Sequence, residues 1–290
     1  MGRWRRPAEQ LNLKKPFRSD ARGLCSWCLQ FHMMWCVFKV QDPSMRDSTS
    51  PLWRRLACVC LAGHLVSCAT LNEPARKVLD RLPLTFTAQD KSQWEPVLLP
   101  GKLRTAFRLE KHQGRQSLRA DAERSASMLR QRLNIQPEQL GRLVFEWQVE
   151  ALIADADMRQ RETEDSPVRL ILAFDGDRQK FSAKNAMLSE LSRALTGEEL
   201  PYATLMYVWS NQLPVGTVIV NPRTDRVRKI VVESGADHVK QWRHYERQIK
   251  ADYEKAFGEA PGALQGLAIM TDTDNTQGQA RAWYGEIRLD

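Results

Sequence analysis

Cysteine is confined to the first 68 of the 290 residues, and residues 69–290 contain none. The six cysteines are Cys25, Cys28, Cys36, Cys58, Cys60 and Cys68. The C-terminal part therefore has neither a disulfide framework nor a thiolate metal site. It also lacks a Pro/Gly/Ser-rich linker, a low-complexity segment and an internal repeat, so we expect its 222 residues to form one domain.

That part of the chain also lacks an excess of charge of either sign. The whole chain has a net charge of +8, but residues 1–68 carry 11 of the 43 basic and only 4 of the 35 acidic side chains. The remainder holds 32 basic and 31 acidic side chains and is nearly neutral. Nucleic-acid binding proteins concentrate basic residues in the binding domain, so we expect no nucleic-acid partner.

Signatures of catalysis are missing too. The chain contains no Gly-x-Ser-x-Gly, P-loop, Gly-x-Gly-x-x-Gly or His-Glu-x-x-His motif. Carboxylate pairs do occur, for example Glu162 with Asp165 or Glu233 with Asp272, and a glycosidase needs two carboxyl groups at a defined separation. The sequence therefore leans away from an enzyme but leaves a glycan hydrolase open as an alternative.

Long hydrophobic runs are absent as well. The stretch LACVCLAGHLV at residues 56–66 would span roughly 16 Å as a helix, whereas a bilayer needs about 20 residues. A basic segment at 45–55 precedes it and a small residue before cysteine follows it, which are the three parts of an export signal. Leu65-Val66-Ser67-Cys68 resembles the lipobox of bacterial lipoproteins, in which the cysteine is acylated and becomes the first residue.

This resemblance implies a lipid anchor at Cys68 and a periplasm-facing protein of the bacterial cell envelope. Ala69, where an aspartate would favour the inner membrane, makes the outer membrane the expected location. We expect a signal peptide at 45–67, a tether at 68–80 and a domain at 81–290. Because export signals lie at the N-terminus, we interpret Met45 as the true start, and residues 1–44 as an upstream translation artefact or a disordered segment.

Alternating apolar residues predict strands in the domain. Leu143, Phe145, Trp147 and Val149 alternate with other side chains, which is typical of a half-buried strand. Similar runs lie at 103–109, 168–174, 205–209, 216–220, 227–232, 267–270 and 283–289. Many short strands with few helix-length crossovers predict a mainly β fold, an antiparallel β-sandwich of the jelly-roll, carbohydrate-binding-module type.

Two helices are expected to pack on this sandwich, each ending before a glycine that suits a left-handed C-cap. The first ends before Gly197 and has apolar residues at helical spacing, namely Met187, Leu188, Leu191 and Leu195. The second ends before Gly258 and has the apolar residues Trp242, Ile249, Tyr253 and Phe257.

Charged and aromatic residues at strand ends are the candidate ligand-binding residues. Arg161, Glu162 and Asp165 precede the strand at 168–174, and mixed charges grip polar ligands, although a solvated loop would look the same. Trp209 and Asn211 end another strand, where an aromatic rim suits a sugar ring, and Glu233 ends a third. Within the final strand, alternation places Trp283 in the core and Tyr284 on the opposite face.

An oxygen-rich loop, TDTDNT at residues 271–276, suits a hard cation such as calcium. Its candidate ligands are Asp272, Asp274 and Asn275. It does not match an EF-hand, because Trp283 stands where that loop requires a glutamate. An ordinary Asx-rich turn explains the pattern equally well.

Several longer segments resemble a bacterial family known as domain of unknown function 3047. They are RETEDSPVRLILAF, YVWSN, VVESG, DYEKAFG, LAIMTDTDNT and AWYGEIRL, and the resemblance spans residues 80–290. It implies an envelope protein without an assigned activity. The last segment also resembles the closing strand of sandwich-type carbohydrate-binding modules.

The sequence hypothesis is therefore an envelope lipoprotein that binds a carbohydrate or another polar envelope ligand through loops of a β-sandwich. The alternatives are a glycan hydrolase, and a structural or assembly lipoprotein that contacts other proteins. A large exposed apolar patch would favour the last of these.

Overall fold

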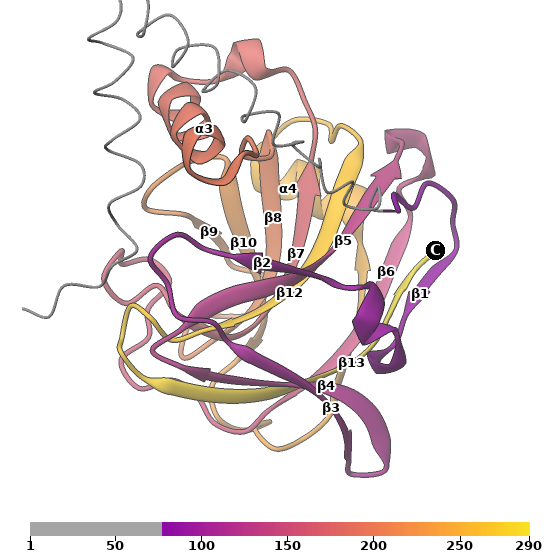
Figure 1. The fold of residues 1–290 in the computed structure, drawn as a ribbon, viewed down its shortest axis with the longest axis vertical. Helices are drawn as coiled ribbons and strands as arrows, with labels where there is room; N and C mark the ends of the chain where they lie inside the picture. The colour runs from indigo at the N-terminus through magenta and orange to yellow at the C-terminus, as the bar shows by residue number, and fades with distance from the viewer. Residues whose placement is uncertain (1–76) are drawn as a thin grey trace, which may run out of the picture. The chain divides into compact units, whose positions relative to one another are not determined.

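Two β-sheets pack face to face in the part of the chain that the computed structural model describes, residues 77–290 (Figure 1). The predicted signal peptide, Cys68 and the segment 1–44 lie outside these residues. Within the described part, no helix has the length and hydrophobicity needed to cross a membrane. The predicted mainly β sandwich with two α-helices is confirmed.

The first sheet has six strands in the order β11-β6-β13-β4-β3, with β1 also paired to β13. Their bounds are β1 Leu84–Phe86, β3 Ala106–His112, β4 Arg115–Glu123, β6 Arg142–Val149, β11 Arg243–Gln248 and β13 Gln279–Leu289. All pairings in this sheet are antiparallel.

The second sheet has seven strands in the order β2-β5-β12-β7-β8-β10-β9. Their bounds are β2 Glu95–Leu98, β5 Ala126–Ile135, β7 Ser166–Phe174, β8 Ala203–Ser210, β9 Val218–Val220, β10 Val227–Ser234 and β12 Leu264–Asp272. The β8–β10 pair is parallel, and the other pairs are antiparallel.

Helices occupy the connections. α3 (Ala183–Thr196) lies between β7 and β8, and α4 (Ile249–Phe257) lies between β11 and β12. Residues 77–290 also contain three short 3-10 helices, η2 Ala88–Gln93, η3 Pro137–Gln139 and η4 Arg178–Lys180. Gly197 and Gly258 adopt the left-handed conformation directly after α3 and α4, which confirms both predicted C-caps.

Between the sheets lies a continuous core rich in aromatic side chains. Phe145 and Trp147 of β6 contribute to it, as do Tyr207 and Trp209 of β8. All four side chains are essentially inaccessible to solvent. The alternation seen in the sequence of β6 therefore correctly identified its inward face.

The prediction for β13 was wrong, because the register shifts between Tyr284 and Ile287. Tyr284 points into the core together with Ile287. Trp283 is buried as predicted, at 3 % exposed, but on the outer face, where it stacks on His112 with ring centroids 3.8 Å apart. Gly285 lies at this irregularity, where a Cβ atom would collide with the Glu146 side chain. A bulge reverses the inward and outward pattern that simple alternation predicts.

Both helices also differ from their predictions. Trp242 does not belong to the second helix, because residues 243–248 form β11 and α4 begins only at Ile249. α3 forms as expected, but of its four predicted apolar residues only Leu188 is half-buried. The other three, Met187, Leu191 and Leu195, are 65, 53 and 63 % exposed.

Candidate functional site

A groove of about 800 Å³ lies on the outer face of the seven-stranded sheet. The alternation of inward and outward side chains in β7 shows how the sheet forms the groove. Leu170 and Leu172 point into the core, whereas Arg169, Ile171 and Ala173 point outward and line the groove. Outward residues of β2, β5, β8 and β12 extend the same surface. A volume of this size is typical of ligand-binding clefts, roughly 300–1,000 Å³.

The floor of the groove is aliphatic and rich in methionine. It is formed by Ala126, Met128, Ile171, Ala173, Met206, Ala268 and Met270. No aromatic side chain occurs among the described residues that line the groove. Methionine is flexible and polarizable, and it adapts to apolar ligands of different shapes.

A buried ion pair closes one end of the floor. Arg169 and Asp272 are each only 3 % exposed, and the guanidinium donates to both carboxylate oxygens, Nε to Oδ1 and Nη2 to Oδ2, at 2.7 Å. Burial raises the pKa of Asp272 to about 6, although Arg169 opposes this shift. The other guanidinium nitrogen, Nη1, contacts the sulfur of Met206 on the floor at 3.8 Å.

A second buried pair lies behind the first. The Lys229 ammonium group is fully buried and lies 2.7 Å from Oε1 of Glu164. Glu164 also binds Arg223 at 2.8 Å and accepts a bond from the amide of Asn221. Burial lowers the pKa of Lys229 to about 8. This end of the groove is thus built from charges that neutralise one another.

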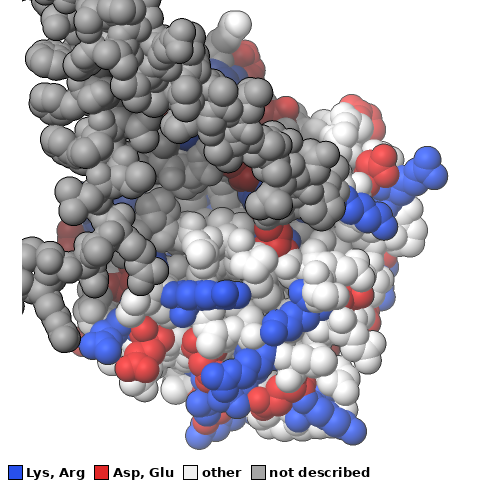
Figure 2. Space-filling model, in the orientation of Figure 1, with Lys and Arg blue, Asp and Glu red and all other residues white. Residues whose placement is uncertain are grey.

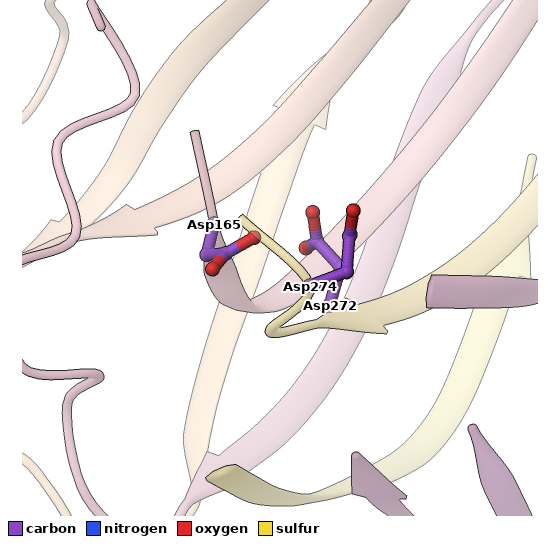
Figure 3. Close-up of side chains that lie close together, drawn as sticks. All are labelled: Asp165, Asp272 and Asp274. Carbon is purple, nitrogen blue, oxygen red and sulfur yellow. The ribbon is translucent and has the colours of Figure 1, made fainter. Parts of the chain in front are cut away.

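The loop after β12 borders the same end, where Asp165, Asp272 and Asp274 lie close together (Figure 3). One carboxylate oxygen of each lies within 4.8 Å of the other two. Asp165 accepts bonds from the backbone N–H groups of Asn275 and Thr276, and Asp274 pairs with Lys102. A cation here would compete with donors that these carboxylates already have. Calcium binding by Asp272, Asp274 and Asn275 stays a prediction.

The opposite end carries a partly exposed charge network. Arg130 and Arg132 each bind both Glu95 and Glu198. Hydrogen bonds from the two arginines, foremost Arg130, lower the pKa of Glu198 to about 2. On the face shown in Figure 2, basic and acidic side chains are interspersed among uncharged residues. The groove therefore runs between two charged ends over an apolar floor.

The structure separates the residues proposed from the sequence into two groups. Asp272, Asp274 and Asn275 line the groove, and Asp165 holds their loop in place. Arg161 joins this group through its carbonyl oxygen, which accepts a bond from the Asn275 amide at 2.8 Å. Glu162 is exposed in the preceding loop.

Three other proposed residues lie away from the groove. Trp209 is fully buried and donates to the Gly235 carbonyl oxygen, so the predicted exposed aromatic rim is wrong for this residue. Asn211 donates to the Ile153 carbonyl oxygen, and Glu233 is held by His238, Arg243 and Tyr245. The strand carrying Trp209 continues the apolar alternation to its end, which buries the ring.

Most groove residues were missed at the sequence level. Arg169 did carry a signal, because it is the one charged residue in the otherwise apolar run of β7. A charged residue inside such a strand needs a buried partner. Met128, Met206 and Met270 gave no such signal, since apolar residues on both faces of a strand look alike in sequence.

The fold and groove together define a β-sandwich protein with a ligand-sized cleft on one sheet. Residues 92–288 match the family described as "Protein of unknown function (DUF3047)", and the chain belongs to this family. No curated protein is similar enough to the chain to count as a match.

Three solved structures are similar at low identity. The low-affinity xylan-binding module CBM86 from Roseburia intestinalis is 11 % identical, with 72 % of this chain and 96 % of that chain covered and a TM-score of 0.27. The xyloglucanase domain of NopAA from Sinorhizobium fredii is 9 % identical, with coverages of 66 and 90 % and a TM-score of 0.36.

The third structure is a loop-swap mutant of Necallimastix patriciarum Xyn11A, 10 % identical, with coverages of 71 and 96 % and a TM-score of 0.28. Because all three TM-scores are low, none of these proteins assigns a ligand to this chain.

Proposed function

We propose that this protein is a lipid-anchored protein of the bacterial envelope that binds an extended ligand in the groove. The observation that carries the proposal is the apolar, methionine-rich floor between two charged ends. The ligand has a polar part, a carbohydrate or another charged or hydroxylated group, and an aliphatic part that covers the floor. Lipid anchoring rests on the lipobox resemblance at Cys68.

The pairing of the groove carboxylates supports binding rather than hydrolysis. A glycosidase needs one carboxyl group to protonate the leaving oxygen and another as nucleophile or base. Glu164 and Asp272 are held by buried cations, while Asp274, Glu198 and Glu199 pair with Lys102, Arg130 and Arg178 respectively. Glu95 binds both Arg130 and Arg132. Each of these carboxylates already has a cationic partner, which suits it to orienting a ligand; Asp272, whose pKa is about 6, is only 3 % exposed.

The composition of the floor favours a ligand with an aliphatic part over a bare oligosaccharide. Sugar-binding surfaces use aromatic faces to stack on pyranose rings, and the described lining of this groove offers none. Apolar burial stabilises a complex by roughly 25 cal/mol per Å² removed from water. An acyl or other hydrocarbon chain along Met128, Met206 and Met270 would use this surface.

Blocking the groove tests the proposal. Ala173 lies on the floor, so Ala173→Trp places a ring where the ligand would lie. Binding of acylated and plain envelope glycans, fatty acids and lysophospholipids is measured by calorimetry. We expect at least one class to bind, and Ala173→Trp to weaken it by about tenfold or more.

The matched control is Val215→Trp, at a position 60 % exposed and away from the groove lining. Urea unfolding confirms that both variants remain folded. The proposal is wrong if both variants bind like the original chain, or if a folded original chain binds none of these classes.

A further inference from the structure

Helix α3 packs against the sandwich with a mainly polar face, in which Leu188 is half-buried between Asn185 and Ser189. Asn185 and Ser189 are 5 and 4 % exposed and point toward the body of the protein. The Asn185 amide donates to Asp225 at 2.7 Å and its oxygen accepts from Thr224 at 2.8 Å. Arg178 donates to the Ser189 hydroxyl oxygen at 3.2 Å. These bonds fix the helix in an orientation opposite to that of an ordinary amphipathic helix.

The opposite face of α3 is an exposed apolar stripe, formed by Met187, Leu191 and Leu195. Their spacing of four residues aligns them along one side of the helix, and each is more than half exposed. Scattered exposed aliphatic residues are ordinary on protein surfaces, but three in line on one helix mark a contact surface. The stripe contains no Trp, Tyr or Arg, the residues that dominate protein–protein hot spots.

The position of the stripe points to its partner. The described chain enters the fold beside α3, because the backbone of Leu79 bonds to Arg132 and Asn134. The Arg132 guanidinium in turn binds Glu198, two residues beyond the end of α3. The predicted lipid anchor, Cys68, precedes Leu79 by eleven residues, which reach at most about 40 Å when extended.

We infer that α3 lies on the surface of the lipid bilayer, with Met187, Leu191 and Leu195 inserted between the head groups. This inference rests on the lipid anchoring in the proposed function and adds a second membrane contact. It also places the groove beside the membrane, because Ser192 and Thr196 of α3 line the groove. An amphiphile could then pass from the bilayer to the aliphatic floor without crossing water.

Quenching by brominated lipids tests the inference. The full chain, with Leu191→Trp or Leu109→Trp, is placed in vesicles of phosphatidylethanolamine and phosphatidylglycerol with or without bromine on the acyl chains. Leu109 of β3 is the matched control, since it is 51 % exposed against 53 % for Leu191. The fluorescence of the original chain is subtracted from that of each variant.

We expect bromine to lower the added fluorescence of Leu191→Trp about twofold and to leave Leu109→Trp unchanged, because an interfacial helix reaches roughly 5–10 Å into the membrane. Equal behaviour of the two variants would overturn the inference. The inference would also be overturned if sedimentation showed a dimer of the original chain that M187Q/L191Q/L195Q abolishes, since the stripe would then bind a second copy. Calorimetry with groove ligands is a separate measurement, so failure of the membrane contact and failure of the groove are distinguishable.

Discussion

Replacing Arg169 with methionine is expected to destabilise the protein strongly at neutral pH. The substitution keeps most of the side-chain volume but leaves Asp272 buried, with only the Ser166 N–H as donor among its described partners. Breaking a buried pair by removing one partner costs about 3–5 kcal/mol. For a domain of this size, that lowers the melting temperature by roughly 6–20 °C.

The cost of Arg169→Met should depend on pH. The pKa of Asp272 is about 6 in the folded protein, above its ordinary value of 3.8. A raised pKa means that this group favours folding when protonated, so its contribution declines as the pH rises through about 6. Loss of Arg169 raises that pKa further, and at pH 5 the carboxyl is neutral in the folded variant. The cost should then fall to about 1–3 kcal/mol, that of an unsatisfied polar group.

Urea unfolding at pH 7.5 and at pH 5, monitored by tryptophan fluorescence, measures the loss of unfolding free energy at each pH. Adding Asp272→Leu to Arg169→Met should restore stability at pH 7.5 to within about 1 kcal/mol of the original, because no charge is left unpaired. The control is Arg159→Met, which breaks a pair whose arginine is 53 % exposed, and should cost less than about 1 kcal/mol. A cost below 1 kcal/mol for Arg169→Met, or the same cost at both pH values, would refute this reasoning.

Three further predictions concern the loop after β12 and the ligand. Asp165→Ala removes three hydrogen bonds, from the N–H of Asn275 and from the N–H and hydroxyl of Thr276. It should lower the free energy of unfolding in urea by about 2–3 kcal/mol and speed hydrogen exchange at residues 273–278. No change in either measurement would contradict this prediction. Millimolar calcium should raise the melting temperature of the original chain by less than about 1 °C, because Lys102 and Arg169 already neutralise the aspartate cluster after β12. The rise should be larger in Lys102→Met. A larger rise in the original chain, reversed by EDTA, would show that calcium displaces these cations. An acylated glycan should bind about tenfold more tightly in calorimetry than the same glycan without its acyl chain, and equal affinities would contradict a role for the apolar floor.

Sequence patterns identified strands better than they identified faces. The clean alternation of β6 identified both the strand and its buried side, because nothing interrupts its pleat. In β13 the same reasoning placed Trp283 and Tyr284 on the wrong faces, since the register shift before Ile287 depends on pairing with β6. Such a bulge is a property of two strands and is not visible in either one.

The orientation of α3 shows a second limit. Apolar spacing and Gly197 correctly predicted the helix and its end. Its buried face is nevertheless mainly polar, because Asn185 bonds to Thr224 and Asp225, and Ser189 to Arg178. These partners lie outside the helix and form no pattern with it in the sequence. Local periodicity cannot reveal which face a fold supplies with hydrogen-bond partners.

The groove itself follows from sheet order rather than from local sequence. Its floor combines β5, β7, β8 and β12, which become neighbours only through long-range antiparallel pairing. The loop with Asp272 and Asp274 was recognised because its composition is unusual, whereas the floor methionines were not. A polar cluster within one segment can be recognised from its unusual composition. An apolar cleft cannot be recognised in this way, because its residues come from several strands that meet only in the assembled sheet.

Methyl NMR of the methionines tests the central claim, that ligand binds in the groove, most directly. With 13C-methyl methionine in the chain, Met128, Met206 and Met270 report on the floor. Met158 is buried in a second cluster, with Val208 and Ile219, against which Met206 also packs. Titration with the acylated ligand that binds most tightly in calorimetry should shift the three floor signals strongly and Met158 much less, because Met158 senses the ligand only through Met206. Saturable binding without shifts at Met128, Met206 and Met270 would place the ligand elsewhere and contradict this function for the groove.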